Sequence, residues 1–337
     1  MRNEYTFPKT LQEAIQYFSD EETCIQFVAA LRWDDGKPVC PRCQSEDSTY
    51  MEKRRVWRCK DCNKQYSVKV GTIFEESPIP LHKWLAGMWI IAGAKNGVSS
   101  YEIHRSLGIT QKSAWFMMHR LRLAMQNGSI LKIGGKGGAV EVDETYIGGK
   151  ARNMHRDRRW RMSTGTAGKA AVIGLLERHP EKGRSRVKVS HIQNTRRQDL
   201  QPIVRQNVEP GTSLYTDAHS GYDGLNDEYF HEFVNHAETY ARGKVHTNGL
   251  ENFWSLLKRG LRGTYVSVEP FHLFRYLDEQ SFRYNNRKDM NDADRFIAMM
   301  SGIVGRRVTY KKLTGKEGVC APSVNAVANV DDERMPF

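Results

Sequence analysis

The stretch AVEVDETYIGG, residues 139–149, marks a change in the pattern of the chain. Residues before it carry apolar side chains at helical spacing, whereas this stretch resembles a strand. Two more strand-like stretches follow, then a helical one and two further strands; these lie at 170–178, 186–193, 195–208, 213–222 and 231–236. The order of elements after residue 139 is therefore the first guide to the fold.

Three strands, a helix, a strand and then helices is the order of an RNase H-like α/β domain. We predict a catalytic domain of this fold over 138–300 and a C-terminal tail over 301–337. Between its first two strands lies the basic segment 150–169, KARNMHRDRRWRMSTGTAGK, which has no strand pattern. We interpret it as a loop that becomes ordered on DNA phosphates. Its candidate contacts are Arg156, Arg158, Arg159 and Arg161.

The stretch HTNGLENFWSLLKRG, residues 246–260, is typical of the start of a helix. At 3.6 residues per turn, an acid and two bases share one face, Glu251, Lys258 and Arg262. Asn248 joins that face if the helix starts early enough. Leucines and Phe253 form an apolar stripe on the other face. Taken alone, the pattern favours an ordinary amphipathic helix with a solvated polar face, so the acids elsewhere have to decide its role.

Two aspartates, Asp143 and Asp217, lie on the first and fourth predicted strands. These strands are neighbours in an RNase H-like sheet, so the two carboxylates should converge, with Glu251 on the helix as a third. Three carboxylates can hold two Mg²⁺ (or Mn²⁺) ions, which prefer oxygen ligands and promote in-line phosphoryl transfer. Bases of the same helix would hold the DNA phosphates; they are Lys258, Arg259 and Arg262.

Other acids and aromatic residues lie close to these positions. We interpret Glu144, Asp223 and Asp227 as acids that support the site from behind or lie on the surface. Tyr222 and Trp254 are expected in the core. His219 and His246 either orient a metal-bound water or have a purely structural role.

Four of the six cysteines form two pairs, Cys40-x2-Cys43 and Cys59-x2-Cys62, with 15 residues between the pairs. This spacing is typical of a tetrahedral four-cysteine zinc site. The residues between the pairs suit a short hairpin. We therefore predict a zinc ribbon over 36–72 with one structural Zn²⁺, preceded by a helical segment over 1–35.

Residues 79–130 have the pattern of a helical DNA-binding domain. Ser99 is a cap for a helix through Leu107, Gly108 suits a turn, and Thr110 caps a second helix that ends near Met125. Helix, glycine turn and capped helix form a helix-turn-helix pattern, although an αα-hairpin in a core gives the same one. On the second helix we expect four exposed DNA contacts, Lys112, His119, Arg120 and Arg122.

The formal charge of the 337-residue chain is +12. A chain this basic is expected to bind a polyanion, most often nucleic acid. No apolar run is long enough to span a membrane, and the first residues lack the apolar core of a signal peptide. We therefore expect a cytoplasmic protein without a membrane partner.

Four blocks of the sequence together resemble a known family. VDETYIGGK, YTDAHSGY, HTNGLENFWSLLKRG and YLDEQSFRYNNR are similar to blocks of bacterial DDE-type insertion-sequence transposases, in the subgroup with an N-terminal zinc ribbon and an RNase H-like catalytic domain. The resemblance covers roughly residues 10 to 315. It implies an enzyme that binds the terminal inverted repeats of its mobile element, cuts there and joins the ends to target DNA.

The resemblance also implies roles for single residues. Asp143 and Asp217 take the two aspartate positions, and Lys258 takes the lysine seven residues after the glutamate. The third metal ligand in this group is either Glu or Asn, so both Glu251 and Asn248 are candidates. Charge favours Glu251, because two Mg²⁺ ions need more negative charge than two aspartates supply.

Two other functions remain compatible with the sequence. One is a DNA-binding regulator with an inactive RNase H-like domain, and the other is a nuclease without strand transfer. A protein that acts on two double-stranded DNA ends is expected to work as a homodimer or a higher oligomer.

Overall fold

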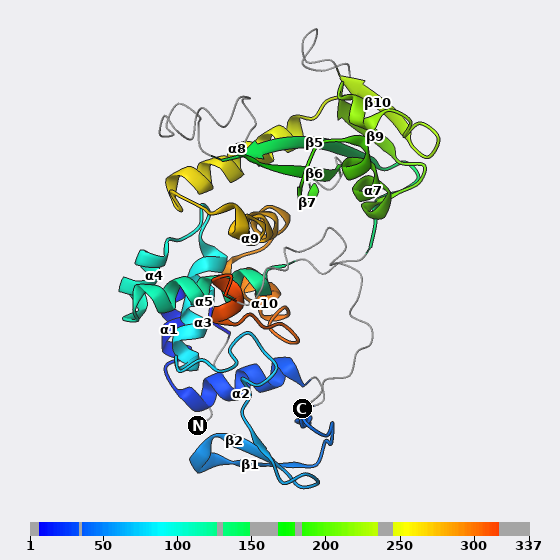
Figure 1. Ribbon diagram of the computed structural model, residues 1–337. Helices are drawn as coiled ribbons and strands as arrows, with labels where there is room; N and C mark the ends of the chain where they lie inside the picture. Colours follow the sequence, from blue (N-terminus) through cyan, green and yellow to red (C-terminus); the bar gives the residue numbers. More distant parts are fainter. Residues whose placement is uncertain are drawn as a thin grey trace. The chain divides into compact units, whose positions relative to one another are not determined.

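The computed structural model describes residues 7–33, 36–126, 131–148, 168–178, 184–234 and 245–316. Contacts divide these residues into two units (Figure 1). One unit contains the described residues within Met1–Gln126 and Asp289–Val319, and the other contains those within Asn127–Lys288. None of the described helices combines the length and the apolar character that a membrane span requires.

The first unit begins with two short helices and the cysteine-rich module. Its helices are α1 Leu11–Tyr17, α2 Glu21–Arg32, α3 Leu81–Gly93, α4 Ser100–Leu107, α5 Gln111–Ala124, α10 Asp292–Met300 and α11 Tyr310–Leu313. The module is a three-stranded antiparallel sheet with the order β1-β2-β3, made of β1 Ser48–Met51, β2 Val56–Cys59 and β3 Gln65–Tyr66, with the short η1 Glu52–Arg54. It confirms the predicted zinc-ribbon hairpin.

The helix-turn-helix pattern is present with the predicted caps. Ser99 and Glu102 form a capping box at the start of α4, and Thr110 accepts a hydrogen bond from the Ser113 amide at the start of α5. Gly108 ends α4 with a φ of 58°, a left-handed conformation that glycine adopts without steric cost. Local capping chemistry therefore sets these boundaries.

The C-terminal part of the described chain differs from the expected domain boundary. We expected the catalytic domain to reach residue 300, but α10 packs on α3 in the first unit. Phe296 of α10 is fully buried, with its ring centroid 5.0 Å from that of Trp89 and 6.0 Å from that of Phe27. The apolar face of α10 thus completes a core made by residues far earlier in the chain, which makes this unit discontinuous in sequence.

The second unit is built on a five-stranded sheet with the order β10-β9-β5-β6-β7. The strands are β5 Ala139–Ile147, β6 Ala170–Arg178, β7 Arg186–Ile192, β9 Ser213–Asp217 and β10 Phe230–Val234. The first three are antiparallel neighbours, while β9 runs parallel to β5 and β10 parallel to β9. This is the RNase H-like arrangement that the element order predicted.

Helices cover both faces of this sheet, as Figure 1 shows. Helix α7 Arg197–Asn207 packs on one face through Leu200 and Val204, while α8 Asn248–Gly263 and α9 Leu273–Asn285 cover the other. The remaining elements are short: β4 Ile133–Gly134, which pairs with β8 Val208–Glu209, and the single turns η3 Ser220–Tyr222 and η4 Pro270–His272. A sheet buried on both faces holds its strand ends in fixed positions.

Candidate active site

Three carboxylates meet where β5 and β9 separate. The paired ladder between these parallel strands ends at Glu141 and Tyr215. Just beyond it, one carboxylate oxygen each from Asp143, Glu144 and Asp217 lies within 4.8 Å of the others. The structure thus brings the two sequence-predicted aspartates together. A set of carboxylate oxygens this close suits a hard divalent cation such as Mg²⁺.

Asp143 is the most firmly held of the three. Its Oδ2 accepts a hydrogen bond of 2.9 Å from the Nε1–H of Trp254 on α8, and its Oδ1 accepts one of 2.9 Å from the Glu144 amide. Burial raises the pKa of Asp143 to about 6, and the negative charges of Asp217 and Glu251 add to this effect. Trp254 therefore has a polar role in addition to its expected place in the core.

Glu144 is the site residue that sequence reasoning missed. Its side chain is only 7% exposed, and burial, followed by repulsion from Asp217 and Asp143, raises its pKa to about 8. Successive residues of a strand point to opposite faces of a sheet, so a strand pattern alone does not place Glu144 beside Asp143. The pairing of β5 with β9 ends at Glu141, however. Beyond it, Asp143 and Glu144 can both bring a carboxylate oxygen close to Asp217.

A buried acid on β5 fixes the start of helix α8. Glu141 is 1% exposed, and its Oε2 accepts a 2.9 Å hydrogen bond from the Leu250 amide in the first turn of α8. Its Oε1 accepts a 2.6 Å bond from Arg178. A Cβ on Gly249 would lie 2.8 Å from Glu141 Oε2, so a larger residue at this position would have to displace the Glu141 carboxylate. The strand that carries Asp143 thereby positions the helix that carries Glu251.

The two candidates for the third ligand, Asn248 and Glu251, both lie exposed on the first turn of α8. Glu251 does not belong to the compact group of three carboxylates. Glu251 is nevertheless close enough for its charge to raise the pKa of Asp143. Further along the helix, burial and the positive charge of Arg262 lower the pKa of the half-buried Lys258. The negative charge of Asp143 opposes this decrease in part. Arg259 and Arg262 are exposed on the same helix.

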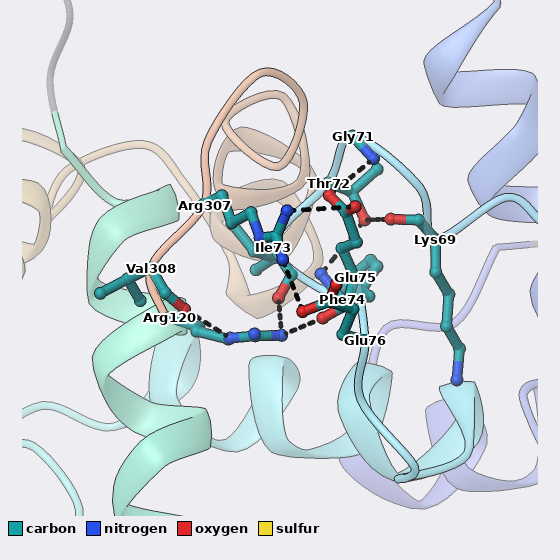
Figure 2. A network of polar contacts seen from close by, with 10 residues as sticks. All are labelled: Lys69, Gly71, Thr72, Ile73, Phe74, Glu75, Glu76, Arg120, Arg307 and Val308. Carbon is teal, nitrogen blue, oxygen red and sulfur yellow. Dashed lines mark hydrogen bonds and ion pairs between the residues drawn. The ribbon is translucent and has the colours of Figure 1, made fainter. Parts of the chain in front are cut away.

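Three of the four expected DNA contacts on α5 are in fact buried. His119, Arg120 and Arg122 are 0%, 3% and 1% exposed, so the expectation that they face solvent is wrong; only Lys112 is exposed. The Nη1 of Arg120 donates to the carbonyl oxygens of Ile73 and Glu75 at 2.9 and 2.6 Å, and its Nε donates to that of Val308 at 3.3 Å (Figure 2).

The cause of this burial lies outside the helix-turn-helix sequence. The segment after the ribbon pairs with the segment after α10, through the Thr72–Val304 bridge and a 3.0 Å bond from the Ile73 amide to the Ile303 carbonyl. Arg120 joins both segments to α5. Figure 2 shows its guanidinium between the backbone of Ile73–Glu75 and Val308. A helical-wheel projection of α5 identifies the face opposite its local core as the exposed one. In the folded unit, the segments around Ile73 and Val308, which are distant in sequence, cover that face.

We expect Arg120→Ala to unfold the first unit more easily. Three backbone carbonyls would lose a charged donor in a buried site, which should lower the free energy of unfolding by about 3 kcal/mol or more. Urea denaturation followed by circular dichroism measures the change. The matched control is Arg105→Ala, which removes an exposed arginine of α4 and should shift stability by less than about 0.5 kcal/mol. Equal stability of both variants would contradict the anchoring role.

The predicted contacts of the basic segment, Arg156, Arg158, Arg159 and Arg161, lie outside the described residues.

The four ribbon cysteines form the second cluster of metal-ligating side chains. The Sγ atoms of Cys40, Cys43, Cys59 and Cys62 all lie within 4.8 Å of one another. The distance is 3.7 Å from Cys40 to Cys62 and 3.5 Å from Cys43 to Cys59, close to the edge of a ZnS₄ tetrahedron with bonds of about 2.3 Å. The cluster therefore fits one structural Zn²⁺.

Cys40→Ser should remove this metal and unfold the ribbon. So small a sheet depends on the metal for much of its folding energy, while the second unit has its own core. We expect loss of one bound zinc per chain and an early unfolding transition. Elemental analysis and calorimetry measure both, with Cys24→Ser, a buried cysteine outside the cluster, as the control. Full zinc content in Cys40→Ser would rule out the assignment.

Both units match known protein families. Residues 136–285 match a family model described as the ISXO2-like transposase domain, and residues 19–65 match one described as the transposase zinc-ribbon domain. An uncharacterized protein in transposable element ISH50 of Halobacterium salinarum is 26% identical over 262 residues, which cover 73% of this chain and 85% of that protein. An uncharacterized transposase-like protein of Haemophilus influenzae is 34% identical over 96 residues, covering 28% of this chain and 77% of that protein. No solved structure matches this chain.

Proposed function

This chain belongs to the insertion-sequence transposases that combine a zinc ribbon with a DDE-type catalytic domain, and from this premise we propose that it cuts and joins the DNA ends of its own mobile element. The observation that supports the chemistry is the group of carboxylates where the pairing of β5 with β9 ends, beside the start of α8. Such a group binds Mg²⁺ or Mn²⁺ well, because both ions prefer oxygen ligands.

In the proposed reaction, a water or a 3′ hydroxyl attacks a phosphorus atom in line with the leaving 3′ oxygen. Two bound Mg²⁺ ions would lower the pKa of the nucleophile and neutralise the leaving oxygen. Asp143 and Asp217 would hold the ions, and Glu251 or Asn248 would complete the ligand set. The Trp254 hydrogen bond keeps the Asp143 carboxylate in one orientation.

Positive side chains of α8 would orient the DNA. Lys258 lies seven residues after Glu251, two turns along the same helix, so it can hold a phosphate adjacent to the one that reacts. Arg259 and Arg262 extend this surface. Because each neutralised phosphate releases counterions, binding should weaken steeply as salt increases.

Binding to the element ends would rest on the first unit and on the basic segment. Lys112 is the exposed base on α5, and its Nζ lies 4.8 Å from the ring centroid of Tyr310. We assign double-stranded DNA, both element ends and target, as the partner. Synapsis of two ends implies a homodimer or a higher oligomer on DNA.

The decisive experiment is strand joining with the purified protein. Linear DNA that carries the sequences flanking the gene, together with a supercoiled target plasmid, should give joined products with Mg²⁺ or Mn²⁺ and none with EDTA. Cleavage without joining would identify a nuclease. Specific binding without any cleavage in either metal would identify a DNA-binding regulator, and either result would overturn the proposal.

A further inference from the structure

Glu144 has an unusual environment for an acid. Its Oε1 is inaccessible to solvent and has no hydrogen bond of ordinary geometry from the described residues. The Tyr222 hydroxyl is close enough to lower the pKa of Glu144, and His219 Nδ1 is 3.9 Å away. A buried carboxylate that is poorly hydrogen-bonded is costly. The side chain is nevertheless directed toward two further carboxylates, Asp143 and Asp217, and a cation between the three would supply the buried oxygen with a strong partner.

We propose that Glu144 is a direct ligand of the catalytic divalent ions, in addition to Asp143, Asp217 and the ligand from α8. This inference rests on the proposed metal-dependent function. Two oxygen ligands on opposite sides of one Mg²⁺ lie about 4.2 Å apart, and the three carboxylates already offer oxygens within 4.8 Å of one another. Small side-chain movements would therefore bring oxygens of all three carboxylates to the distances at which they can coordinate an ion.

Charge balance supports the same assignment. Two divalent ions carry four positive charges, and the carboxylates of Asp143, Glu144, Asp217 and Glu251 carry four negative ones when ionised. Without Glu144 the site would hold one charge too few for neutrality. With it, the charges of the ionised carboxylates and of two bound ions would balance.

The test is Mn²⁺ binding to the full-length, zinc-loaded protein without DNA. Electron paramagnetic resonance of the free ion measures the affinity, and thermal unfolding measures the stabilisation by bound Mn²⁺. Glu144→Gln keeps the size of the side chain and removes its charge. We expect affinity for Mn²⁺ to fall about tenfold or more and the Mn²⁺-induced rise in Tm to shrink. The Tm of the metal-free variant should equal or exceed that of the wild type, because repulsion is removed.

Two further variants complete the design. Asp223→Asn removes an exposed acid six residues after Asp217 and should leave both measurements unchanged. Glu144→Asp keeps the charge on a shorter side chain and should recover part of the Mn²⁺ affinity. This recovery separates coordination from a purely steric effect.

The opposite pattern would overturn the inference. The buried hydroxyl of Tyr222 lies beside Glu144 and can donate to it. If Glu144 only supported this tyrosine, Glu144→Gln and Tyr222→Phe would both lower the metal-free Tm, and both would bind Mn²⁺ like the wild type. Absence of Mn²⁺ binding in the wild type itself would instead refute the proposed function along with the inference.

Discussion

Asp143→Asn and Asp217→Asn should each abolish DNA cleavage and strand joining while leaving binding to the element ends intact. Each change removes one negative charge from the group that would hold the ions. A loss of several kcal/mol of transition-state stabilisation, at about 1.4 kcal/mol per factor of ten, corresponds to a rate lower by about 10³-fold or more. Binding should survive, because it would rest on the ribbon, the helical module and the basic segment.

The structure indicates that these variants alter the proposed metal site without disturbing the fold. An asparagine at position 143 retains an oxygen that can accept the Trp254 hydrogen bond, and removal of a charge from a crowded group lessens repulsion. The variants should therefore fold at least as stably as the wild type. Gel-shift titration and the joining assay, on the same preparation, measure binding and chemistry. Retained joining in either variant would refute the metal mechanism.

Glu251→Gln and Asn248→Ala together should identify the third ligand. If Glu251 is the ligand, Glu251→Gln removes a negative charge at the ions and should lower the cleavage rate by about 10³-fold. Asn248→Ala should then have a smaller effect. Both residues lie exposed on the first turn of α8, which Glu141 anchors to β5, so neither change should disturb the helix.

A matched control is available for the charge effect. Glu269→Gln neutralises another exposed acid of the same unit and should cleave at the wild-type rate. Single-turnover cleavage at saturating Mg²⁺ measures all three variants. A larger loss in Asn248→Ala than in Glu251→Gln would assign the third ligand to Asn248 and leave Glu251 in a supporting role.

Features that depend on near neighbours in the chain were predicted well. The cysteine spacing indicated the ribbon, the caps Ser99 and Thr110 placed two helix starts, and the order of strands and helices indicated the sheet. Each of these depends on hydrogen bonds or periodicity within a few residues, or on short connections between elements. The convergence of Asp143 and Asp217 followed from the same order, because the first and fourth strands are neighbours in this fold.

What depends on residues distant in sequence was decided only by the tertiary structure. The sequence by itself determined which residues form helices, strands and the cysteine cluster, since local bonding specifies them. It did not reveal that the segment around Val308 returns to cover α5, so exposed DNA contacts were expected at Arg120 and its neighbours. Nor did it reveal that the β5–β9 ladder ends early enough for Glu144 to join the aspartates. Exposure and side-chain convergence are properties of packing, and packing brings together residues that no local pattern connects.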